Sequence, residues 1–136
     1  MQISVNGKNI ELNFGIRFVK ELNEKFHITL DSGKRIGSGL EETVPMLFTG
    51  DILALEDILQ AAAWGAENRP SQEELEDYLD SVEDIEALFD EVLGELKNQN
   101  ATRKKTLALV ADLEERAKAE ATLKKTQKIL KSSTKK

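Results

Sequence analysis

Residues 47–96 read "LFTGDILALEDILQAAAWGAENRPSQEELEDYLDSVEDIEALFDEVLGEL", and this stretch decides the fold because it contains three successive helix patterns. The first pattern covers residues 51–64, where Gly50 can end the preceding helix and Asp51 can cap the next. The second opens at Ser71, which stands three residues before Glu74 in capping-box spacing. The third covers residues 84–97. Apolar positions of the first and third patterns recur at helical spacing and predict buried faces, made up of Leu55, Ile58, Leu59, Ala62, Ile85, Leu88, Phe89, Val92 and Leu96.

The N-terminal residues alternate between apolar and polar side chains on both sides of Asn6-Gly7. Asn-Gly between two such runs predicts a β-hairpin, because both residues tolerate positive φ. A two-residue turn pairs Ile3 with Ile10, whereas a four-residue loop pairs Ile3 with Leu12. Both registers leave one side of the ribbon apolar. A two-stranded ribbon is marginal alone, so we expect this side to lie on helices.

A first helix is predicted over residues 15–26, where Phe18, Val19, Leu22 and Phe26 form one apolar stripe. His27 follows it and has no second histidine or cysteine to share a metal, so we interpret it as a helix-end residue. Residues 31–39, "DSGKRIGSG", are predicted to be a loop from their glycine and serine content.

A short helix is predicted near residues 40–48, with two possible starts. Ser38 and Glu41 have capping-box spacing, which would place Pro45 inside the helix and bend it. Alternatively, Thr43 caps a shorter helix that has Pro45 in its first turn.

The C-terminal part is predicted to be one long helix over residues 103–131, after a polar hinge at 97–102 and before a disordered end, "KSSTKK". Its apolar face is thin, and Arg103, Lys104 and Lys105 have the wrong sign for the N-terminal end of a helix dipole. We expect it to be mobile or to become ordered on a partner. The domains expected are therefore 1–100, an acidic body, and 101–136, a basic helical or flexible tail.

The charge distribution separates the same two regions. Residues 1–100 carry 8 Lys/Arg and 21 Asp/Glu, a net charge of −13, whereas residues 101–136 carry 11 and 4, a net charge of +7. A basic tail on an acidic body indicates contact with an acidic partner, with the body of another copy, or with nucleic acid. The remaining alternative is a solvated helix rich in lysine. Nucleic acid is disfavoured because the tail has no aromatic side chain to stack on bases.

The residue types for catalysis or metal binding are scarce. The chain has no cysteine and one histidine, which excludes disulfides, His–Cys catalytic pairs and zinc sets of several histidines or cysteines. Gly33-Lys34 is followed by Arg35 where a phosphate loop needs Ser or Thr. The acidic cluster of Asp77, Asp80, Glu83 and Asp84 lacks the order of a calcium loop. We predict no catalytic, cofactor or metal site, no signal peptide and no membrane span, and hence a soluble protein.

The order of these patterns resembles the tail assembly chaperone family of long-tailed, siphovirus-type phages and prophages of Gram-positive bacteria. The resemblance covers residues 1–98. The residues that carry it are Asn6-Gly7-Lys8, Phe14, Phe18, Leu22, Gly50-Asp51, Leu55, Ile58, Ala61-Ala62, Tyr78, Leu79, Asp84-Ile85, Leu88, Phe89 and Leu93. It implies a non-enzymatic factor that binds the phage tape measure protein, keeps this long helical chain soluble until tail tube subunits assemble around it, and then leaves. The resemblance also implies a place in the cytoplasm of the bacterial host, absence from the mature virion, and in related systems a frameshifted longer form that recruits the tail tube protein.

The sequence thus predicts an α+β fold: a mostly α-helical domain with a small N-terminal β-hairpin and a long C-terminal basic helix. We expect a tail assembly chaperone that also forms homo-oligomers. The alternatives are a structural connector of the phage particle and a nucleic-acid-binding protein. Trp64 is either core filling or a partner contact. The candidate partner-binding residues are Trp64, Arg103, Lys104, Lys105, Arg116, Lys124 and Lys125.

Overall fold

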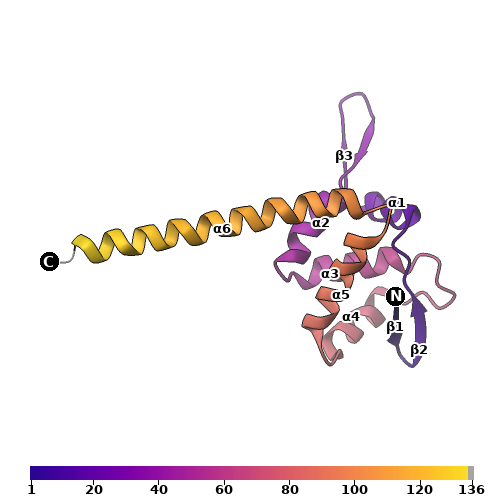
Figure 1. The fold of residues 1–136 in the computed structure, drawn as a ribbon. Coiled ribbons are helices and arrows are strands. Elements are labelled where there is room, and N and C mark those ends of the chain that lie inside the picture. The colour runs from indigo at the N-terminus through magenta and orange to yellow at the C-terminus, as the bar shows by residue number, and fades with distance from the viewer. Residues whose placement is uncertain (135–136) are drawn as a thin grey trace.

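The structure is a computed structural model that describes residues 1–134. These residues form six helices and four short strands joined by loops, which confirms the predicted mostly helical α+β class (Figure 1). In chain order they are β1 Gln2–Val5, β2 Lys8–Glu11, α1 Ile16–Lys25, β3 His27–Thr29, β4 Arg35–Gly37, α2 Gly39–Phe48, α3 Ile52–Ala62, α4 Gln72–Ser81, α5 Ile85–Asn98 and α6 Arg103–Thr134.

Helix α3 lies at the centre of the body, where α1, α2 and α4 all pack against it. Its predicted stripe is buried, with Leu55, Ile58 and Ala62 fully inside. Phe14 and Phe18 meet edge to face at 5.1 Å between ring centroids, next to this stripe in the same core cluster. The β1–β2 hairpin adds Ile3 and Ile10 to the core, so the apolar side of the ribbon lies on helices as predicted.

The β1–β2 hairpin has the two-residue turn. Ile3 pairs with Ile10, and the turn residues Asn6 and Gly7 have φ of 53° and 75°. The four-residue alternative is therefore wrong. Asn6 Nδ2 also donates to Glu74 Oε2 at 2.8 Å, which attaches the turn to α4.

Two helices begin at the predicted caps, Asp51 and Ser71, and Asp84, which was predicted only as the first residue of the third helix, caps α5. Asp51 accepts from the amides of Leu53 and Ala54, Ser71 and Glu74 form a complete capping box, and Asp84 accepts from the amide of Ala87. Gly50 has φ of 87°, the left-handed conformation expected at the end of α2. Because α3 ends at Ala62, Trp64 stands just beyond the helix rather than within it.

Helix α2 follows the longer alternative, with Pro45 inside it, but the predicted capping box is absent. Ser38 Oγ donates to Glu42 Oε2 at 2.6 Å instead of capping the helix. The amide of Gly39 donates to Asn23 Oδ1 at 2.9 Å, so a side chain of α1 supplies the acceptor. A partner this distant in sequence cannot be read from local spacing.

The prediction of a loop over residues 31–39 is wrong in part, because β3 and β4 form a second antiparallel hairpin here. Ile28 pairs with Ile36, and Gly33 takes φ of 85° in the connecting turn. The strands have only three residues each, and the glycines and serines around them concealed the pattern.

Helix α6 is joined to the body by packed residues, which corrects the prediction of a polar hinge at 97–102. Thr102 is fully buried, and its hydroxyl donates to the carbonyl of Leu96 at 2.6 Å. Thr106 and Val110 are also buried, where α6 packs against α2 and α5. Residues 131–134 of the predicted disordered end continue the helix, and residues 135–136 lie outside the described part of the chain.

Candidate partner-binding surfaces

The predicted basic residues form two groups on α6, with Arg116 between them. Arg103, Lys104 and Lys105 lie in its first turn, where Lys105 forms an ion pair with Glu41 of α2. Lys124 and Lys125 lie about 30 Å further along the helix at 1.5 Å per residue. The predicted residues therefore do not form one site.

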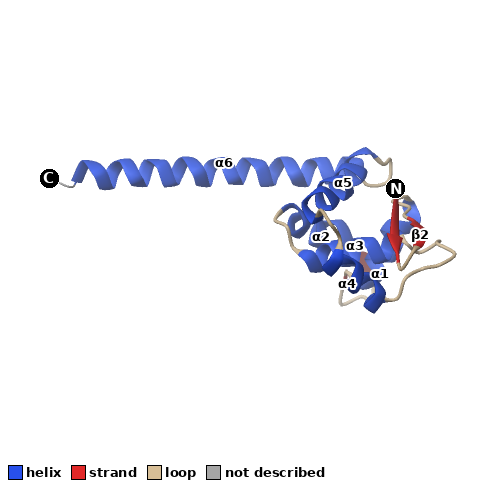
Figure 2. Ribbon diagram, turned by 90° about the horizontal axis from the view of Figure 1, so that it is seen from below, coloured by secondary structure: helices blue, strands red, loops and turns tan. Residues whose placement is uncertain are grey.

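The distal part of α6 projects from the body (Figures 1 and 2). Val110 is the last buried residue, and every side chain from 114 to 131 is exposed. Arg116 pairs with Asp112 within the helix at 3.1 Å. Leu123 is 59% exposed, although it is a large apolar residue. This segment is a basic helix whose apolar side chains face solvent.

Trp64 is half-buried and packs against the core cluster. The guanidinium of Arg17 lies over its ring, 5.1 Å from the ring centroid. The indole Nε1 is buried and has no hydrogen-bond partner among the described residues. Trp64 therefore contacts the core, and part of its side chain stays exposed.

An open groove of about 350 Å³ lies between the end of α2 and the start of α5. Ile85, Phe89 and Leu93 recur every four residues along its α5 wall, and each is half-buried. Glu86 and Asp90 stand beside this row and are exposed. The α2 side contributes Leu47 and Phe48. The result is an apolar groove with an acidic rim, a form that accepts one face of a helix.

The β3–β4 hairpin projects from the body as an arm (Figure 1). Its cross-strand pair, Ile28 and Ile36, is 58% and 45% exposed, and Leu30 is 43% exposed. At the base of the arm, Arg35 Nη2 lies 3.1 Å from both ring nitrogens of His27 and 3.7 Å from Glu24. His27 is the first residue of β3, two residues after the end of α1. Its Nδ1 lies 3.2 Å from the carbonyl of Asn23 in that helix.

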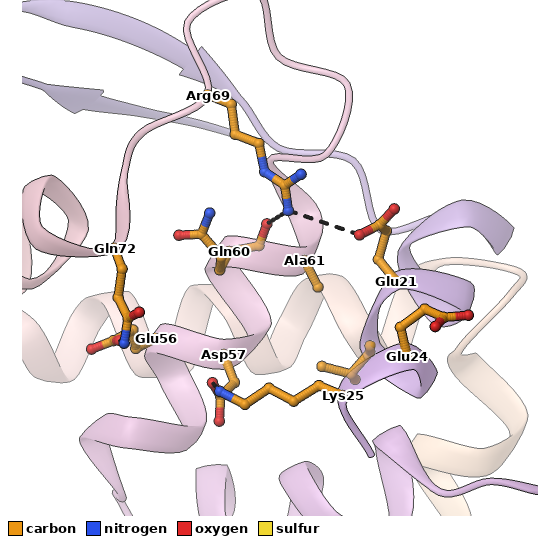
Figure 3. A pocket seen from close by; sticks show the side chains of 10 residues that line it. Glu21, Glu24, Lys25, Glu56, Asp57, Gln60, Ala61, Arg69 and Gln72 are labelled. Carbon is orange, nitrogen blue, oxygen red and sulfur yellow. Dashed lines mark hydrogen bonds and ion pairs between the residues drawn. The ribbon is translucent and has the colours of Figure 1, made fainter. Parts of the chain in front are cut away.

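A polar pocket of about 410 Å³ lies between α1, α3 and the segment before α4 (Figure 3). Four of its charged side chains form two ion pairs: Lys25 with Asp57, and Arg69 with Glu21 at 3.8 Å. Arg69 also donates to the carbonyl of Gln60 at 3.1 Å. No group of three or more His, Asp or Glu placed to hold a metal occurs among residues that the structure describes.

One carboxyl in this pocket has a shifted pKa. Burial raises the pKa of Glu56, and the nearby Glu76 and Asp57 raise it further. A hydrogen bond from Gln72, at 3.2 Å, acts in the opposite direction.

Sequence reasoning missed the groove and the arm, although each left a signal. Helix α5 has a second apolar row, Ile85, Phe89 and Leu93, beside the buried row that faces the core. A helix with two apolar rows carries more apolar surface than one buried face requires. For the arm, the signal was a pair of isoleucines on either side of Asp-Ser-Gly.

Comparison with known proteins relates the chain to a protein family. A family model described as "Phage tail assembly chaperone protein, TAC" matches residues 2–111, which cover the body and the packed turns of α6. No curated protein and no solved structure matches the chain. Within the described residues, no helix combines the length and apolar character that a membrane span needs.

Proposed function

The chain belongs to the phage tail assembly chaperone family, and we propose that it binds the tape measure protein of its phage. In this proposal it keeps that protein soluble in the cytoplasm of the host, acts without catalysis as a homo-oligomer, and leaves before the virion is complete. A frameshifted longer form would add the tail tube protein to its partners. We also propose that its phage is of the siphovirus type and that the host is a Gram-positive bacterium.

The observation that carries this proposal is the exposed apolar face of the β3–β4 arm. Ile28 and Ile36 lie side by side because they are cross-strand partners, and Leu30 follows in the turn. Single exposed apolar residues need no explanation, but a group on a projecting element marks an interaction site. An amphipathic helix of the tape measure protein would bury this face with its own apolar stripe.

The test is co-expression with the tape measure protein of the same phage. We expect the wild-type chain to bring most of the tape measure protein into the soluble fraction, in a complex with several copies per chain. The variant Ile28→Ser/Ile36→Ser should lose most of this effect. Its matched control is Ile16→Ser/Leu53→Ser, which changes two aliphatic residues outside the arm that are more exposed, at 69% and 65%, and should behave as wild type.

Two results would count against the proposal. If the tape measure protein stays insoluble when it is co-expressed with the wild-type chain, the chaperone role is wrong. If the two double variants solubilise it equally well, the arm is not the contact. Mass spectrometry of purified virions adds a separate check. We expect the chain to be absent, whereas its presence at stoichiometric amounts would favour a structural connector.

A further inference from the structure

We propose that the groove between α2 and α5 receives the distal part of α6 from a second copy of this chain. The groove has an apolar floor and an acidic rim, and distal α6 has an apolar seam and a row of lysines. This contact is separate from the arm and needs no tape measure protein. It would give the homo-oligomer a defined interface.

The helix side of the contact follows from the positions of its residues. Leu123 and Leu130 are seven residues apart, so they lie on the same face of α6 about 10 Å apart. Lys124, Lys128 and Lys131 recur at four and three residues and form a row on one side of the helix, turned about 80–160° around its axis from the leucines. Both leucines are 59% exposed. The seam and the lysine row together form a surface that is apolar on one side and basic on the other.

The groove side has a matching spacing. Glu86 and Asp90 are four residues apart on α5, as Lys124 and Lys128 are on α6, so both pairs are separated by about 6 Å along their helices. The apolar row from Ile85 to Leu93 extends about 12 Å, enough to cover both leucines. With α6 laid along α5, the lysines would meet the acidic rim while the leucines enter the groove. The overall charges, −13 for residues 1–100 and +7 for the rest, favour the same contact.

The occupant must come from another copy because α6 cannot return to its own body. It is one continuous helix from Arg103, and Leu123 lies about 20 Å beyond Val110, its last buried residue. Bringing Leu123 to the groove of the same chain would require breaking the helix. A helix tip of one copy in the groove of another closes a dimer when the contact is reciprocal, and otherwise produces rings or open chains.

Two charge-reversed variants test this contact in the full chain. Lys124→Glu/Lys128→Glu puts an acidic helix against an acidic groove, and Glu86→Lys/Asp90→Lys puts a basic helix against a basic groove. We expect wild type to form oligomers in sedimentation velocity that dissociate as salt is added. Each variant alone should associate at least about tenfold more weakly. All four substituted residues are exposed, so the fold should survive, which circular dichroism can verify.

A mixture of the two variants provides the decisive measurement. In the mixture, the acidic helix meets the basic groove and the unchanged basic helix meets the unchanged acidic groove, so association should return to the wild-type level. The matched control, Lys20→Glu/Lys34→Glu, makes the same change in net charge at two exposed lysines of the body outside the groove and should still assemble. A monomeric wild type, a mixture that fails to associate, or a control as weak as the test variant would each overturn the proposal. None of these results depends on whether the tape measure protein is bound.

Discussion

Gly39 and Gly94 are both helical, but they have opposite surroundings. A Cβ on Gly39 would lie 2.8 Å from Leu22 Cγ and 2.8 Å from Asn23 Oδ1, whereas one on Gly94 would meet nothing within 4 Å. We predict that Gly39→Ala lowers the free energy of unfolding by about 1–3 kcal/mol, because α1 and α2 must move apart. Gly94→Ala should raise it by about 0.5–1 kcal/mol through helix propensity. Urea denaturation of both variants measures the two effects, and effects of the same sign would contradict the packing described.

The buried carboxyl of Glu56 predicts a dependence of stability on pH. Its pKa is raised by burial, so the folded state favours the protonated form. The stability that this preference contributes is fully present below the unfolded pKa, about 4.3, and is lost as pH rises through the higher folded value. Glu56→Gln keeps an acceptor for Gln72 and removes the charge. It should therefore melt above wild type at pH 7, and the two curves should converge in acid.

Thermal melts across this pH range provide the measurement, with Glu83→Gln, an exposed glutamate near the start of α5, as the control. A Glu56→Gln protein that melts below wild type at pH 7 would show that the carboxylate is stabilised by its contacts rather than destabilised by burial.

At the scale of the element, the capping box of α4 joins two parts of the fold. Ser71 Oγ accepts from the amide of Glu74 at 3.1 Å, and the carboxylate of Glu74 accepts from both the amide of Ser71 and the side chain of Asn6. We predict that Ser71→Ala lowers the free energy of unfolding by about 1 kcal/mol. Hydrogen exchange should also rise at the β1–β2 turn, because Glu74 positions it.

Urea denaturation measures the effect of Ser71→Ala on stability. The control is Ser32→Ala, in the turn of the arm. Ser32 is exposed, and its loss should change stability by less than about 0.5 kcal/mol. Equal losses in the two variants would mean that the box contributes nothing specific.

Elements fixed by near neighbours could be predicted from the sequence, and those fixed by distant residues could not. Asp51, Ser71 and Asp84 cap helices that begin at the next residue, and Asn6-Gly7 determines the hairpin register, because all these signals act within a few positions. The start of α2 depends on Asn23, from a different helix. The spacing of neighbouring residues gives no sign of this long-range contact.

The candidate surfaces divide in the same way. The basic residues of α6 were evident from charge alone, and the structure confirms that Lys124 and Lys125 are exposed on a helix. The groove was not predicted, because its walls come from α2 and α5, which are far apart in the chain. The burial of Thr102 was not predicted either, since a threonine in a polar stretch gives no sign of the packing around it.

In the whole molecule, the net charge changes sign near residue 100, but α6 stays packed against the body as far as Val110. Thr102, Thr106 and Val110 are buried, and the chain is exposed from 114 to 131. We predict that removing residues 115–136 changes the free energy of unfolding by less than about 0.5 kcal/mol. Removing residues 102–136 should lower it by about 2–5 kcal/mol, because it uncovers α2 and α5. Urea denaturation of both truncated chains tests this, and equal losses would contradict it.

The buried start of α6 has a geometric consequence for an assembly joined from tip to groove. A rigid helix couples length to rotation, because each residue inserted after Val110 moves the tip by 1.5 Å and turns it by about 100°. Insertion of one residue would direct the leucine seam away from a neighbour's groove, whereas insertion of seven would nearly restore its angular phase. Between Val110 and Leu123, the number of residues would therefore be under tighter constraint than their identity.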